Sequence, residues 1–167
     1  MTTTSEAPDG GLTADDFEVA FTPSGGYGED MPAPILSGCT EPLPSHAIDM
    51  RGTWSIVSVE VNEADVPDHG MLGARQRIEQ CGDRVVITSG GVVHDMRANG
   101  RLKDGVHDVA AADFTTEVHV VAAFEDGVHV LRPDGLPIEV RRWIEGEQLV
   151  WSYAGAFTAR LDRTLPR

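Results

Sequence analysis

The sequence predicts an all-β protein, a small antiparallel up-and-down β-barrel of about eight to nine strands that follows an N-terminal segment with a short helix. Residues 52–62 open with Gly52-Thr53-Trp54 and continue as one long strand-like run. From residue 71 to residue 164, short runs of alternating polar and apolar residues are separated by turn residues. This series contains no convincing core helix, and sequential hairpins favour an up-and-down barrel over a Greek-key sandwich.

The chain has 167 residues, of which 41% are hydrophobic, and this is enough for one domain with a real core. We expect the barrel to span residues 51–167 and an acidic extension without Lys or Arg to span residues 1–50. The net charge of −14 argues against nucleic acid or an anionic membrane surface as partner, because both would repel the chain. The sequence has no apolar run long enough for a signal peptide or a membrane span. We therefore expect a cytoplasmic protein, either a monomer or a homodimer.

The N-terminal extension contains one segment with a helical pattern, residues 12–21. Thr13 is a suitable N-cap, carboxylates follow in the first turn, and Phe17 and Phe21 lie one turn apart. Further apolar clusters follow, the first of which begins at Met31. Large apolar residues of this kind favour a lid folded over the barrel. The alternative is a disordered tail or an interaction tail.

The two cysteines, Cys39 and Cys81, are too few for a disulfide framework. For a cytosolic chain the favoured interpretation is two free thiols, and the alternative is that they pair.

The strand near residue 78 fixes the first inward-facing set. Gln76, Ile78 and Gln80 alternate with charged residues, so the charged set should face water and the Gln/Ile set should face inward. Gly82-Asp83 predicts a two-residue turn that places Val85 opposite Gln80, so the apolar faces agree across the turn.

Two later turns extend this interpretation. Asn99-Gly100 predicts a type I′ hairpin that begins from the strand at 92–97. The sequence Glu125-Asp126-Gly127 predicts a three-residue loop that pairs Phe124 with Val128.

The same loop type around Glu145-Gly146 places Arg141, Trp143, Leu149 and Trp151 on one inner face. Each of these side chains could simply fill the barrel. Several glutamines in a packed core are costly unless their hydrogen bonds are satisfied, and this favours a ligand cavity. The residues expected to act in catalysis are Gln76, Gln80 and Tyr153. The residues expected to bind substrate are Phe17, Phe21, Met31, Glu60, Ile78, Trp143, Leu149 and Trp151.

Other kinds of chemistry lack a sequence signal. The six histidines do not show the short-spaced ligand pairs that are typical of zinc sites, so we expect no metal. No Ser-His-Asp or Cys-His arrangement and no phosphate-binding glycine loop stands out, so covalent and hydrolytic chemistry is not suggested. We expect no cofactor.

Gly52-Thr53-Trp54, together with Arg163 on the last strand, resembles the lipocalin-like (calycin) barrels, in which an arginine of the last strand lies across the indole. The heme-binding nitrobindins resemble this chain in the opening Gly-x-Trp, but they continue with glycines where this chain has Ser55-Ile56-Val57. They also rely on a histidine late in the chain, and here no histidine follows His129.

With its acidic, apolar-containing extension, the chain also resembles the lid-bearing [4+2] cyclases, or Diels–Alderases, of spirotetramate and spirotetronate polyketide biosynthesis in actinomycetes, in particular the pyrroindomycin type. The resemblance implies a cofactor-independent intramolecular cyclase that folds a linear polyene tetramate or tetronate inside a lidded barrel. A second hypothesis is a non-catalytic carrier of a small hydrophobic molecule. A third is a protein-binding module that uses the acidic tail.

Overall fold

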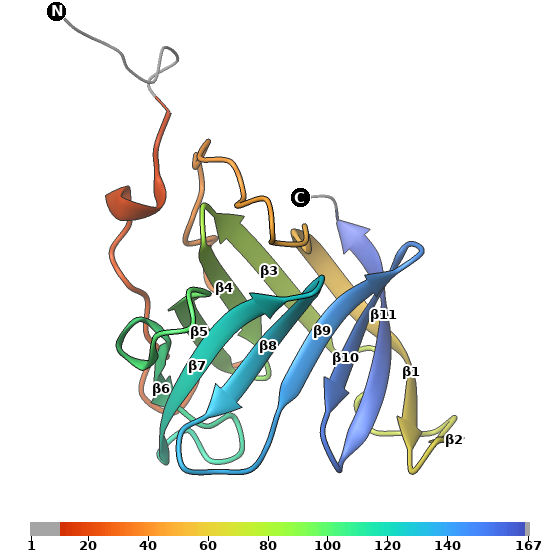
Figure 1. Ribbon diagram of the computed structural model, residues 1–167. Helices are drawn as coiled ribbons and strands as arrows, with labels where there is room; N and C mark the ends of the chain where they lie inside the picture. The colour runs from red at the N-terminus through yellow and green to blue at the C-terminus, as the bar shows by residue number, and fades with distance from the viewer. Residues whose placement is uncertain (1–10, 166–167) are drawn as a thin grey trace, which may run out of the picture.

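The computed structural model describes residues 11–165 and shows a nearly closed antiparallel β-barrel (Figure 1). The hydrogen-bonded order of the strands is β5-β4-β3-β1-β11-β10-β9-β8-β7-β6, and the short β2 pairs with β1. The path follows the chain around the barrel and ends at β5 and β6, so this is the up-and-down arrangement that the sequence predicts. The fold class is confirmed, with more strands than the expected eight to nine.

The regular elements of the described chain are η1 (Ala14–Asp16), β1 (Gly52–Val61), β2 (Ala64–Asp65), β3 (Arg75–Cys81), β4 (Arg84–Ser89), β5 (Val92–Arg97), η2 (Leu102–Asp104), β6 (Val106–Val109), β7 (Glu117–Glu125), β8 (Val128–Pro133), β9 (Val140–Glu145), β10 (Gln148–Tyr153) and β11 (Phe157–Leu165).

The turn between β3 and β4 has the predicted register, since Gln80 pairs with Val85 across Gly82-Asp83. The turn between β7 and β8 does not, because its loop has two residues instead of three. Asp126 and Gly127 both have positive φ, at 51° and 78°, as a type I′ turn requires. Phe124 therefore pairs with His129, and the predicted partner Val128 was wrong.

The same difference of one residue changes the face of β9. Glu145 pairs with Gln148 around a two-residue loop that begins with Gly146 at φ 60°, the first-position glycine of type II′ turns. Because side chains alternate along a strand, Arg142 takes the inner face in place of the expected Arg141. Trp143 was also predicted to face inward, and it lies on the outer face.

The predicted hairpin at Asn99-Gly100 was wrong. After β5 the chain turns toward β7: the Gly100 amide donates to the Ala122 carbonyl over 2.8 Å, and β6 pairs with β7. A Cβ atom on Gly105 would lie 1.8 Å from the Val120 carbonyl oxygen, so only glycine permits this approach. Strands β5 and β6 are thereby left as neighbours that do not form a ladder in the described chain.

The N-terminal segment forms one turn of 3₁₀ helix, η1, instead of a helix over residues 12–21. The predicted N-cap at Thr13 is confirmed, with a capping box to Asp16. The backbone carbonyls that would continue the helix accept hydrogen bonds from a side chain of β4. Arg84 donates to the carbonyls of Ala14, Phe17 and Glu18 over 2.9, 2.6 and 2.7 Å.

The rest of this segment lies along the outside of the barrel, beside β4 and β5, before it rises to β1 (Figure 1). Ala14 and Leu36 pack there against Cys81, Val86 and Val93. A disulfide joins Cys39 to Cys81, so the expected free thiols were wrong. The pairing follows from the segment's path, because it carries Cys39 across the end of β3.

The last residues before β1 pack against one end of the core. The Met50 amide donates to Gln80 Oε1 over 2.6 Å, and Gln80 Nε2 donates to the Ile48 carbonyl over 2.9 Å. His46 lies edge-on to Phe124, with ring centroids 6.2 Å apart. Within residues 11–165, no helix is both long and apolar enough to cross a bilayer.

Candidate functional site

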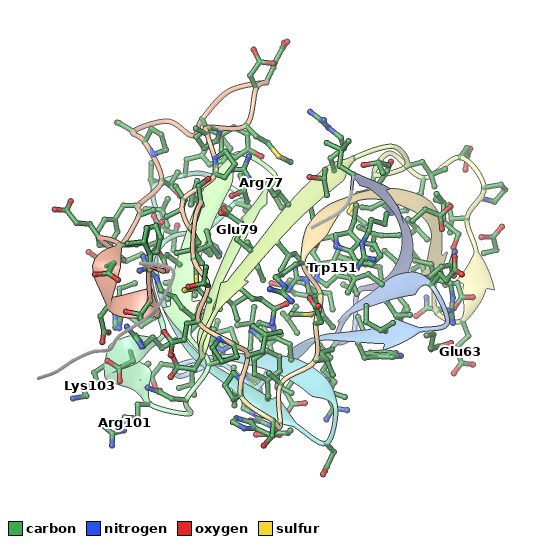
Figure 2. The ribbon with its side chains drawn as sticks, turned by 90° about the horizontal axis from the view of Figure 1, so that it is seen from above. Glu63, Arg77, Glu79, Arg101, Lys103 and Trp151 are labelled. Atoms are coloured by element: carbon green, nitrogen blue, oxygen red, sulfur yellow. A yellow bond between two sulfur atoms is a disulfide. The ribbon has the colours of Figure 1, made fainter. Side chains whose placement is uncertain are left out.

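Four hydrogen-bonding side chains of the barrel interior lie together, and we call them the interior polar cluster. They are Gln76 on β3, His129 on β8, Arg142 on β9 and Trp151 on β10, and strand pairing places Arg142 directly beside both His129 and Trp151. Arg142 Nε donates to Gln76 Oε1 over 3.2 Å, and the guanidinium carbon lies 4.9 Å from the centre of the Trp151 ring. In Figure 2, Trp151 lies within the ring of strands.

Three members of this cluster are deeply buried, Trp151 is half-buried, and the cluster is incompletely hydrogen bonded. Gln76, His129 and Arg142 are 1%, 0% and 4% exposed. Gln76 Nε2, Arg142 Nη1, Trp151 Nε1 and both ring nitrogens of His129 have no hydrogen-bond partner. Buried polar groups in proteins are nearly always paired with protein, ligand or ordered water, so several orphaned groups at one place make this a candidate site.

The charge at this site is unbalanced. Among the described residues, no carboxylate forms an ion pair with Arg142. Burial lowers the pKa of Arg142 to about 9, so the guanidinium is still charged at pH 7. Burial, with a smaller contribution from Arg142, lowers the pKa of His129 to about 3, so His129 is neutral. The interior polar cluster is therefore a cationic donor set.

His129 makes stability sensitive to acid. In the unfolded chain a histidine has a pKa near 6.5, so below that pH the unfolded state takes up a proton that the folded state does not. We expect the free energy of unfolding to fall by up to about 1.4 kcal/mol per pH unit as pH decreases from about 6.5 toward 3. His129→Leu should flatten this slope in urea titrations from pH 7 to pH 4. An unchanged slope would mean that His129 is protonated in the folded protein.

Gln76, Ile78, Leu149 and Trp151 are the predicted site residues that the structure brings to the interior. Ile78 and Leu149 are 1% and 0% exposed in the apolar core. Gln80 is also buried, but both ends of its amide hold the backbone of residues 48–50, as described above. Its amide therefore has a structural role, and the catalytic role of Gln80 stays a prediction.

Tyr153 and Glu60 lie together at the rim of the barrel, where both line a cavity of about 210 Å³. Tyr153 stacks on Phe157 with ring centroids 5.6 Å apart, and Trp151 meets the same ring edge-on at 4.9 Å. The pairing of β1 with β11 shifts register between Ile56 and Ser58. Beyond this point, the side chains of β1 that face inward are those of the opposite parity. Glu60 is therefore half-buried at the rim and not inside.

The remaining predicted site residues lie outside the barrel. Trp143 donates its Nε1 hydrogen to Glu145 on the outer face over 2.9 Å. Phe17 and Phe21 line a cavity of about 390 Å³ at the side of the barrel, and Phe21 is 62% exposed. Met31 is half-buried in the N-terminal segment. The lid over the mouth of the barrel therefore stays a prediction.

Sequence reasoning missed two residues of the site, Arg142 and His129. Arg142 carries its charge, and both side chains are almost fully buried. The available signal was the adjacent pair Arg141-Arg142, which must place one guanidinium on each face of β9. Choosing between them required the loop length. No group of three or more His, Cys, Asp or Glu side chains in the described chain is placed to hold a metal ion.

The fold has a counterpart among solved structures. Human cRBP IV matches with a TM-score of 0.54 and 18% sequence identity, over 70% of this chain and 99% of that chain. At this identity the likeness shows the fold, a lipocalin-like β-barrel, and confirms that part of the sequence prediction. No family model and no curated protein matches the sequence. The resemblance to the [4+2] cyclases stays a prediction.

Proposed function

We propose that this chain binds a hydrophobic small molecule inside its barrel, and that the molecule carries an anionic oxygen that pairs with Arg142. The observation that carries the proposal is the buried, charged Arg142 with an unpartnered Nη1. An uncompensated buried charge costs several kcal/mol, and a ligand anion removes that cost. Gln76 Nε2 and Trp151 Nε1 supply further donors beside it.

The side chains around the interior polar cluster are apolar, as the rest of such a molecule would be. The buried core comprises aliphatic and aromatic side chains from strands all around the barrel, among them Trp54, Ile56, Phe124, Leu131 and Leu161. A ligand with one acidic end and a long apolar body would match this distribution. Human cRBP IV is, by its name, a retinol-binding protein, and its likeness in fold supports a small hydrophobic molecule as the ligand.

The catalytic form of this proposal is a cofactor-independent [4+2] cyclase. Tetramate and tetronate rings are vinylogous acids, so their enolate oxygens suit Arg142, and a polyene chain suits the apolar walls. The cycloaddition forms two C–C bonds from existing π bonds and releases no group, so it needs no nucleophile or metal. Holding the chain in one folded conformer lowers the barrier, and Gln76 would donate to the dienophile carbonyl.

Binding is tested with cis-parinaric acid, a fluorescent polyene carboxylic acid, and with its methyl ester. Arg142→Met should weaken binding of the acid by about 10- to 100-fold, the value of a lost charge-assisted hydrogen bond. Binding of the ester should change little. Arg141→Met is the matched control, because Arg141 is the exposed neighbour that pairs with Glu139 outside the barrel.

Stability of the unliganded protein provides the second readout. Because Arg142 lacks an anion there, Arg142→Met should leave the melting temperature unchanged or raise it. A large loss of stability, or equal loss of acid and ester binding, would show a structural role for Arg142. Incubation with a linear polyene tetramate then separates cyclase from carrier: the cyclase consumes the polyene absorbance and the carrier binds without converting it.

A further inference from the structure

The circle of strands is incomplete between β5 and β6, and only local contacts cross this gap. His94 Nε2 on β5 lies 2.9 Å from the Val109 carbonyl of β6. The ladder that joins every other neighbouring pair is missing here within residues 11–165. The edge of β5 therefore has backbone groups that need other partners.

Residues 17–27, which we call the gap strap, supply those partners. The Val93 amide of β5 donates to Thr22 Oγ1 over 2.9 Å. Thr22 N and Oγ1 both donate to Asp108 Oδ2 of β6, over 2.9 and 3.0 Å. Further along, the Tyr27 amide donates to the Gly91 carbonyl over 2.9 Å. Thr22 is therefore bonded to both edges of the gap.

A cavity of about 390 Å³ lies between the gap strap and the barrel. Its outer walls include Phe17, Phe21 and Lys103, and Lys103 points away from the barrel in Figure 2. Its inner walls include Asp108 and Met96, and Met96 is a core residue with 2% exposure. Met96 therefore belongs both to the wall of this cavity and to the barrel core.

His94 lies on β5 beside the gap, opposite the core residue Ile87 of β4. Burial lowers the pKa of His94, the Val109 carbonyl and Asp108 oppose that change, and Arg142 adds to it. His94 therefore lies within electrostatic range of both Asp108, at the cavity, and Arg142, in the interior. Arg142 lines neither of the two cavities described above, so a ligand needs an opening to reach it.

We propose that the gap between β5 and β6 is the route by which the ligand reaches Arg142, that the 390 Å³ cavity is its vestibule, and that Thr22 and Asp108 latch the gap strap shut. This inference rests on the proposed function. The strap is anchored on one side by Arg84 and on the other by Tyr27. Between these anchors, the Ala20 amide donates to Asp95 on β5 alone, whereas Thr22 bonds to both β5 and β6. Thr22 is therefore the contact that closes the gap in the middle of the strap.

Stopped-flow fluorescence with cis-parinaric acid tests the latch. Thr22→Val keeps the shape of the side chain and removes its hydroxyl, so the association and dissociation rates should both rise at least fivefold, with Kd within about twofold of wild type. Thr164→Val is the control, because Thr164 Oγ1 donates to the Thr53 carbonyl on the other side of the barrel. Its rates should equal those of wild type.

A second measurement needs no ligand. In a Trp143→Phe background, acrylamide quenching reports access to the interior tryptophans, and Thr22→Val should raise the quenching constant at least twofold. The latch is wrong if Thr22→Val changes neither the exchange rates nor the quenching constant. It is also wrong if Thr22→Val raises the dissociation rate alone and so weakens Kd. If Arg142→Met loses affinity while Thr22→Val changes nothing, the ligand site stands and the route is wrong. If Thr22→Val raises the quenching constant but cis-parinaric acid does not bind, the latch stands and the proposed ligand is wrong.

Discussion

Trp54→Ala is expected to lower the free energy of unfolding by about 3–5 kcal/mol, the range for truncating a buried aromatic side chain. The indole is 1% exposed, and its Nε1 donates to the Met50 carbonyl over 2.9 Å. The guanidinium carbon of Arg163 lies 4.4 Å from the ring centre, as the sequence predicts. The substitution therefore opens a cavity, orphans a buried carbonyl and removes a cation–π contact. Urea denaturation followed by circular dichroism measures the loss.

Trp143→Ala is the matched control. Trp143 is half-buried on the outer face, where its hydrogen bond to Glu145 is solvent-exposed. Its truncation removes less buried apolar area, so we expect a loss of about 1 kcal/mol, the typical value for a point substitution. Equal losses for the two tryptophans would contradict both the stabilising role of the buried Trp54 indole and the outward orientation of Trp143.

The two tryptophans show which features of the barrel could be predicted from sequence alone: the strands could, but not always the face on which a side chain lies. Period-two alternation identified the strands, and the β3–β4 turn was predictable because Gly82-Asp83 permits one short loop. At Glu125-Asp126-Gly127 and Glu145-Gly146, two- and three-residue loops were both chemically reasonable. A change of one residue reverses the faces of a strand. The same strand-reading method therefore succeeded for Gln76 and failed for Trp143 and Arg142.

The N-terminal segment differs from its prediction for another reason. Local signals at Thr13 correctly indicate a helix start, but helix propensity is a weak preference that tertiary contacts override. Here the contact comes from Arg84, which lies nearly seventy residues further along the chain. Its guanidinium donates hydrogen bonds to the backbone carbonyls of residues 14, 17 and 18. The local sequence of the segment does not predict this partner. The disulfide between Cys39 and Cys81 is equally a consequence of that long-range path.

Arg84→Ala is expected to destabilise the protein by about 3–5 kcal/mol, the cost of breaking a buried ion pair from one side. Arg84 and Asp95 are joined by two hydrogen bonds of 2.8 and 2.6 Å, and both side chains are almost fully buried. Without Arg84, the Asp95 carboxylate keeps only the Ala20 amide, and three backbone carbonyls lose their donor. Thermal and urea unfolding should both show the loss.

Arg97→Ala, also within the β4–β5 sheet, is the control. Arg97 pairs with Asp83 and Asp15 at a more exposed site, where ion pairs contribute about 1 kcal/mol or less. Replacing both buried partners, as Arg84→Met with Asp95→Leu, should cost less than the sum of the single changes, because no uncompensated charge remains. Limited proteolysis should cut residues 17–27 faster in Arg84→Ala than in Arg97→Ala, since Arg84 holds that segment to the barrel. Equal stability and equal cleavage in the two variants would show that the segment is held by its disulfide and apolar contacts, without a contribution from the buried pair.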